Sequence, residues 1–137
     1  MKKIDAFFND KKNYAAVFIR LIVGAHLVIG VQDNILSWDR MLEFRDFLNL
    51  FEFPVPLVSA ILSVYAQFIC GVLYLIGWKV RLAAIVMIGN FLVALFMVHL
   101  GNDTYVAMFP ALVMLSGSLF LLFNGAGKVS IEEWQRD

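Results

Sequence analysis

Charged side chains are scarce in this sequence of 137 residues. Asp, Glu, Lys and Arg make up 16% of it, against about 25% in soluble domains, and apolar residues make up 61%, against about 45–50%. Between residues 57 and 100 the only charges are Lys79 and Arg81, and residues 104–127 carry none. So few charges cannot cover the surface of a soluble domain. Together with the mean hydropathy of +0.80, this scarcity predicts an integral membrane protein.

Cysteine is nearly absent too, since Cys70 is the single one. The chain therefore has no internal disulfide, no Cys-x-x-Cys redox pair and no cysteine set for an iron–sulfur cluster. It has no glycine-rich nucleotide motif, and its net charge of zero argues against nucleic acid as a partner. We therefore predict no catalytic residue, no metal site and no cofactor within the chain itself.

Four apolar runs are long enough to cross a bilayer, which takes about 20 helical residues. They cover residues 14–31, 57–77, 80–100 and 104–123. The links between the last three are short, so we expect these helices to run in alternating directions. The sequence predicts an all-α fold, in which residues 1–137 form a single membrane domain, an up-down four-helix bundle surrounded by lipid.

The connector at residues 32–56 mixes aromatic and aliphatic side chains with charges. This pattern predicts one or two short amphipathic helices on the membrane surface, with Ser37 as a candidate N-cap. The tail at residues 125–137 contains Ser130 and Glu133 at the spacing of a capping box, which predicts a short helix there.

Basic residues gather on one side of the predicted spans. Arg40 and Arg45 are the only ones on the other side, where acidic residues outnumber them. Cytoplasmic loops are the ones enriched in Lys and Arg, so both termini are expected in the cytoplasm. The basic side holds Lys2, Lys3, Lys11, Lys12, Lys79, Arg81, Lys128 and Arg136.

Polar residues within the spans mark a candidate site. At 1.5 Å per residue, His26, Gln67 and Asn90 lie at a similar depth, roughly 15–18 Å from the basic side, and Arg20 lies nearer that side. We therefore predict an intramembrane polar or ligand cluster of Arg20, His26, Gln67, Tyr74 and Asn90. In the alternative interpretation these side chains only bond neighbouring helices, and Arg20 extends to the membrane surface.

One face of the second span gathers small and polar residues, which let helices approach closely within lipid. We expect this face to point into the bundle. It consists of Ser59, Ala60, Ser63, Gln67, Cys70, Gly71, Tyr74 and Gly77.

Several stretches, taken in order and spacing, resemble the DoxX family of small four-helix membrane proteins. They are "IRLIVG", "PVPL", "AQFICGVLYLIGWKVRLAA", "FMVHLGN" and "GAGKVS". The resemblance covers nearly the whole chain. It implies an association with membrane oxidoreductase systems, which include subunits of thiosulfate:quinone oxidoreductases, and with a bacterial inner membrane.

The resemblance also carries over single positions. Arg20 corresponds to the family's arginine in the first span, Arg81 to the tract entering the third span, and His99 to the histidine that ends it. Two positions depart from the pattern: Gln67 stands where the family usually has glutamate, and Asp33 where it often has lysine. The amide of Gln67 removes the most obvious proton carrier inside the membrane.

These observations favour a non-catalytic subunit of a larger membrane complex, with quinone as the cofactor that the resemblance suggests. One alternative is a scaffold or assembly factor without a ligand of its own, which would dock another membrane protein through Trp38 and Phe44. A second copy of the chain is a further candidate partner. A carrier of a small hydrophobic molecule is less favoured, because the sequence shows no internal repeat.

Overall fold

The computed structural model describes residues 1–101 and 104–137, and every regular element in these ranges is a helix. Four helical segments are long and apolar enough to cross a membrane: Lys12–Leu36, Pro56–Ile76, Val80–His99 and Tyr105–Asn124. The prediction of an all-α membrane protein with four spans is therefore confirmed. In chain order the elements are α1 (Lys2–Asp10), η1 (Lys12–Tyr14), α2 (Ala15–Leu36), α3 (Trp38–Leu50), α4 (Pro56–Ile76), α5 (Val80–Ala94), η2 (Leu95–His99), α6 (Tyr105–Asn124) and α7 (Ile131–Arg136).

One predicted boundary differs from the structure by several residues. The first spanning helix continues to Leu36, so part of the predicted connector belongs to α2. The rest of the connector forms one helix, α3, which begins after Ser37 as predicted, although the Ser37 side chain makes no capping hydrogen bond. The predicted break at residues 101–103 includes residues 102 and 103, which lie outside the described ranges.

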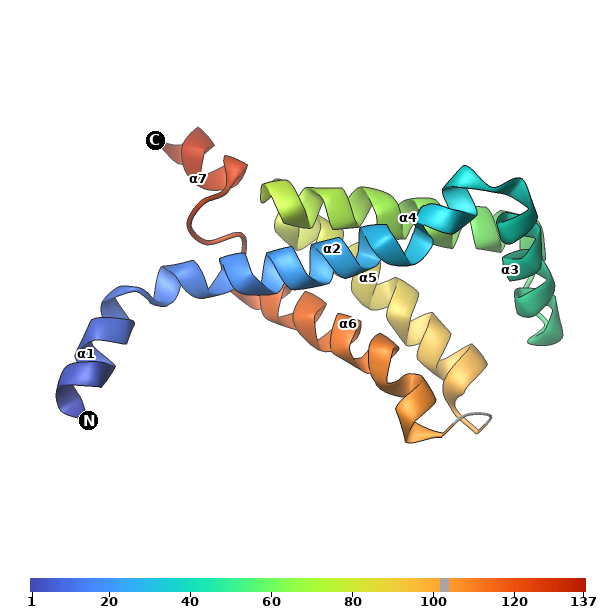
Figure 1. Cartoon of the computed structure of the whole chain (residues 1–137), viewed down its shortest axis with the longest axis horizontal. Coiled ribbons are helices and arrows are strands. Elements are labelled where there is room, and N and C mark those ends of the chain that lie inside the picture. Colours follow the sequence, from blue (N-terminus) through green and yellow to red (C-terminus); the bar gives the residue numbers. More distant parts are fainter. Residues whose placement is uncertain (102–103) are drawn as a thin grey trace.

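The spans form two closely packed pairs (Figure 1). Helices α2 and α4 lie side by side, and α5 packs along α6. Both chain termini lie at one end of the molecule, which we call the terminal end, and α3 lies at the opposite, distal end (Figure 1). Toward the distal end, α5 and α6 diverge from α2 and α4 (Figure 1). This divergence separates the two pairs on the side where α3 lies.

Proline and glycine set the bounds of α4. Pro56 is its first residue, where the missing N–H costs no helical hydrogen bond. Gly77 ends it in the left-handed region at φ 70°, and the N–H groups of Gly77 and Trp78 both donate to the Leu73 carbonyl. The chain then turns at once into α5, which keeps α4 and α5 together at the terminal end.

Helices α2 and α4 meet glycine to glycine. A Cβ added to Gly24 would lie 2.8 Å from the Gly71 carbonyl oxygen, and one added to Gly71 would lie 3.0 Å from the Gly24 carbonyl oxygen. Neither approach leaves room for a side chain. In lipid, where burial between helices brings no hydrophobic gain, such close backbone packing holds helices together.

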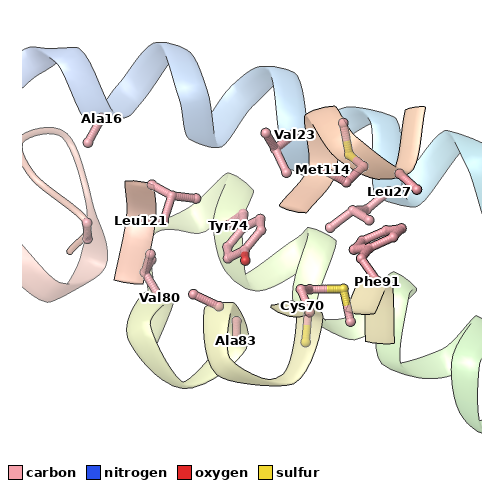
Figure 2. Packing of buried hydrophobic residues seen from close by; sticks show 14 of the residues in the cluster. Ala16, Val23, Leu27, Cys70, Tyr74, Val80, Ala83, Phe91, Met114 and Leu121 are labelled. Atoms are coloured by element: carbon pink, nitrogen blue, oxygen red, sulfur yellow. The ribbon is translucent and has the colours of Figure 1, made fainter. Parts of the chain in front are cut away.

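The main core is centred on Tyr74, whose side chain is fully buried. Figure 2 shows it among residues of all four spans, with Leu121 and Val80 on one side and Cys70 and Phe91 on the other. No residue of the predicted inward stripe of α4 is exposed, and its Ala60, Cys70, Gly71, Tyr74 and Gly77 are buried. The prediction that this face points into the bundle is confirmed.

We predict that Gly24→Ala destabilises the bundle. The new methyl group would press against the Gly71 carbonyl and Leu75, and overpacking of this kind costs about 1–3 kcal/mol. Gly30→Ala is the matched control, because Gly30 lies on the same helix, is exposed, and an added Cβ there meets nothing within 4 Å. Thermal unfolding in one detergent should show a lower Tm for Gly24→Ala alone. Equal Tm values for the two variants would contradict the close α2–α4 packing.

Candidate functional site

Arg20 lies at the terminal end of the bundle and is 1% exposed. Its Nη2 donates to the carbonyl oxygens of Val129 at 2.7 Å and of Lys128 at 3.4 Å. Its Nε and Nη1 are buried and have no hydrogen-bond partner among the described residues. A Cβ on Gly77 would collide with Nη1, so only glycine leaves room for the guanidinium group here. Arg20 therefore reaches toward the membrane surface and is covered there by the tail.

The tail is fixed in place by several contacts with the terminal end. The Lys128 N–H donates to the Asn13 carbonyl, and the Glu132 N–H donates to the Gly77 carbonyl. The Glu132 carboxylate accepts from the Val80 N–H at the start of α5. We call residues 125–130 the tail loop.

The N-cap half of the predicted capping box at the start of α7 is present, whereas the Glu133 side chain bonds the N–H of Val129 and not that of Ser130. The Glu133 N–H donates to Ser130 Oγ at 3.1 Å, and the Glu133 carboxylate accepts from the Val129 N–H. Together with the contacts to Asn13, Gly77 and Val80, this local structure holds the tail loop over Arg20.

Tyr74 lies in the core, whereas His26 lies on the outside of the bundle. The Tyr74 hydroxyl donates to Ser118 Oγ at 2.9 Å, and both residues are fully buried, so this bond ties α4 to α6 inside the core. His26 is exposed on the outside of α2. The predicted cluster grouped it with Gln67 and Asn90, but the face of α2 that carries Gly24 is the one that packs on α4, so His26 does not lie with them around the cavity.

A cavity of about 650 Å³ lies between α3, α4 and α5. This volume falls within the range of about 300–1,000 Å³ that is usual for small-molecule sites. Its walls are mostly apolar, and α3 contributes Phe44, Phe47 and Leu48. Of the predicted site residues, Gln67 and Asn90 line it, whereas Arg20, His26 and Tyr74 do not.

A chain of hydrogen bonds crosses the cavity wall from α4 to α5. Ser63 Oγ donates to Asn90 Oδ1 at 2.8 Å and accepts from Gln67 Nε2 at 3.1 Å. The Gln67 carbonyl oxygen and the Asn90 amide nitrogen have no hydrogen-bond partner among the described residues. The polar part of the cavity is therefore a neutral triad of Ser63, Gln67 and Asn90 with unused hydrogen-bonding groups.

The cavity opens toward the surrounding lipid. Several of its lining residues on α5 are exposed, among them Ile85, Val86 and Val93. The π-helix η2, which extends α5, adds Met97, Val98 and His99 to the lining. Single π-helical turns are frequent at functional sites. A lipophilic molecule could reach the triad directly from the bilayer.

Sequence reasoning missed several lining residues. It assigned Ser63 to the inward face of α4 without giving it a role, yet Ser63 links the two amides. The spacing of Ser63 and Gln67, four residues apart on one helix face, was the available signal. The phenylalanines of α3 could not be placed from sequence, because their position depends on how the connector folds back.

The cavity and the four apolar helices define a class, that of an integral membrane protein with a cavity between its helices. The sequence matches the DoxX family over residues 15–100, which is more than half of the chain, so the protein belongs to the DoxX family. Every lining residue of the cavity falls within the matched range. No curated protein and no solved structure matches the chain significantly.

We predict that Arg20→Leu releases the tail while the bundle stays folded. Leucine inserts into the membrane more easily than arginine, but the Val129 carbonyl loses its charged donor, and such bonds contribute about 1.5–3 kcal/mol. Trypsin cleavage after Lys128 should be at least about tenfold faster in the variant. Arg40→Leu, at an exposed arginine of α3, is the control. Unchanged cleavage in Arg20→Leu would mean that Arg20 does not hold the tail.

We also predict that the tail loosens in acid. Lys128 Nζ lies 2.7 Å from Glu133 Oε1. The hydrogen bond from Lys128 lowers the pKa of Glu133 below its ordinary 4.5, and the same bond raises the pKa of Lys128 above 10.5. Because the pKa of Glu133 is lower in the folded protein, its carboxylate stabilises the docked tail above pH 4.5. This stabilisation is lost as the pH falls through the pKa of Glu133 in the folded state. The same ion pair is also lost when Lys128 deprotonates, and because its pKa is raised this happens only in strong base.

Hydrogen exchange of the Lys128 amide, corrected for its intrinsic pH dependence, is the measurement for this prediction. Protection should be constant near neutral pH and should decrease below 4.5 in the unmodified protein. Glu133→Gln should remove this acid response, whereas Glu43→Gln, at an exposed ion pair in α3, should keep it. An acid response that persists in Glu133→Gln would assign the loosening to another group.

Proposed function

We propose that this DoxX family protein binds a lipophilic quinone in the cavity between α3, α4 and α5, as a non-catalytic subunit of a larger membrane oxidoreductase. The observation that supports this most is the composition of the cavity. Its volume is about 650 Å³, its walls are apolar, and its polar groups are confined to the triad.

The residues of the cavity suit a quinone. The free amide nitrogen of Asn90 provides an N–H donor for a ring carbonyl, and the surrounding phenylalanine and aliphatic side chains suit a ring and a prenyl chain. The opening toward lipid gives such a molecule a route from the bilayer. A bound quinone would supply electron carriage within the membrane. The chain's own residues would hold and orient its head group.

A passive role fits the charge of the site. All three members of the triad are neutral, and the glutamate that is usual in the family is replaced by Gln67. The sequence contains no cysteine pair for redox chemistry. A partner protein would then supply the electrons, and this chain would provide the quinone site.

The charge distribution supports an orientation for this assembly. With the positive-inside rule, the basic terminal end faces the cytoplasm of a bacterial inner membrane, and α3 faces the opposite side. The partner-docking alternative through Trp38 and Phe44 is less favoured. Trp38 is exposed, but Phe44 lines the cavity and is not displayed to a partner.

Native mass spectrometry of the protein, extracted from its own membranes in mild detergent, tests the proposal. We expect a prenylquinone mass retained by the unmodified protein and a redox subunit bound at fixed stoichiometry. Asn90→Leu removes the free N–H donor for a ring carbonyl and should lower quinone occupancy about three- to tenfold, the effect of one neutral hydrogen bond. Gln32→Leu is the matched control, since Gln32 is exposed outside the cavity.

Two results would count against the proposal. If Asn90→Leu and Gln32→Leu retain the quinone equally, the triad does not bind it. A chain that carries no quinone and no partner, as a monomer or as a homo-oligomer, would leave packing as the role of the polar residues.

A further inference from the structure

The triad has a fixed supply of donors and acceptors. Ser63 carries one hydroxyl proton, and it is used in the bond to Asn90 Oδ1. Gln67 Nε2 donates back to the Ser63 oxygen. This leaves the Gln67 carbonyl as a free acceptor and the Asn90 amide N–H groups as free donors, and both side chains line the cavity.

The triad has one free carbonyl and free amide N–H groups whichever way the two linked amides are oriented. If both were reversed, Asn90 would donate to Ser63, and Ser63 would donate to the Gln67 carbonyl. The free groups would then be the Asn90 carbonyl and the Gln67 amide N–H. Because a single hydroxyl proton links the two amides, the cavity presents one free carbonyl beside free amide N–H groups in both arrangements.

We propose that the cavity prefers the reduced, hydroxyl-bearing form of its lipophilic ligand, the quinol, over the oxidised quinone. This inference rests on the proposed function. A quinone carbonyl only accepts, so it can bond the amide N–H but leaves the free carbonyl of the triad desolvated in an apolar site. A quinol hydroxyl both donates and accepts, so it can satisfy the two free groups at once.

The size of the preference follows from the cost of one unsatisfied acceptor. A buried polar group without a partner weakens binding by about tenfold or more. The cavity is therefore expected to prefer one class of ligand, an apolar molecule whose ring carries a hydroxyl group, over the oxidised quinone. The preference is an equilibrium property and requires no electron transfer within the chain.

The test is equilibrium binding to the full chain in lipid nanodiscs under argon. The probes are decylbenzoquinone, its hydroquinone, and the dimethyl ether of that hydroquinone, which keeps the ring and the alkyl chain but has no hydrogen-bond donor. The hydroquinone should bind about tenfold more tightly than either of the others. The dimethyl ether needs no protein variant, so the comparison stands even where a substitution impairs folding.

Two variants test whether the triad causes the preference for the hydroquinone. Gln67→Leu removes one of the two amides, so the hydroquinone should lose its advantage, whereas Gln32→Leu, exposed and outside the cavity, should keep it. Equal binding of all three probes, or tighter binding of the quinone, would overturn the preference and leave quinone binding itself standing. Binding of none of them would overturn both the preference and the proposed function.

Discussion

Hydrocarbon offers no hydrogen-bond partner, so each polar group inside this bundle must find one within the protein. The structure supplies such partners at three places, although Arg20 Nε and Nη1 remain without one among the described residues. Tyr74 pairs with Ser118 in the core, Arg20 bonds the carbonyls of the tail loop, and Ser63 links the amides of α4 and α5. Only at the last place do unused hydrogen-bonding groups face an open cavity.

The cavity follows from how the helices pack. Glycine against glycine holds α2 close to α4, and α5 is held close to α6. Two tight pairs that diverge toward the distal end cannot fill the space between them with their own side chains, and α3 lies across that end (Figure 1). The site is thus a consequence of two different helix-pair geometries joined at the terminal end.

Features that depend on local sequence could be predicted well. The four spans follow from hydropathy, and the N-cap half of the capping box of Ser130 and Glu133 from a spacing of three residues. The inward face of α4 could be predicted because small and polar residues occupy a narrow arc of that helix.

Features that depend on how the helices pack could not be predicted from the sequence. His26 is two residues after Gly24, about 200° further round the helix, so it must face away once Gly24 packs on α4. The α2 sequence has glycines on two different faces, and only the packing shows that the face with Gly24, and not that with Gly30, lies against α4. Gln67 and Asn90 could be grouped by depth, but Ser63 as their link and the α3 side chains of the cavity require the helices to be placed in three dimensions.

The position of the partners of Arg20 has a consequence for biogenesis. The guanidinium group lies in the first span, and the carbonyls that it bonds, those of Lys128 and Val129, are more than a hundred residues later in the chain. Ribosomes make the chain from the N-terminus, so α2 reaches the membrane before its oxygen partners exist. An arginine at a helix centre costs about 2.5–3.5 kcal/mol to insert, and a place near the membrane surface reduces that cost. Arg20 therefore stays without these oxygen partners in the early stages of synthesis, and it bonds them only after residues 128 and 129 have been made.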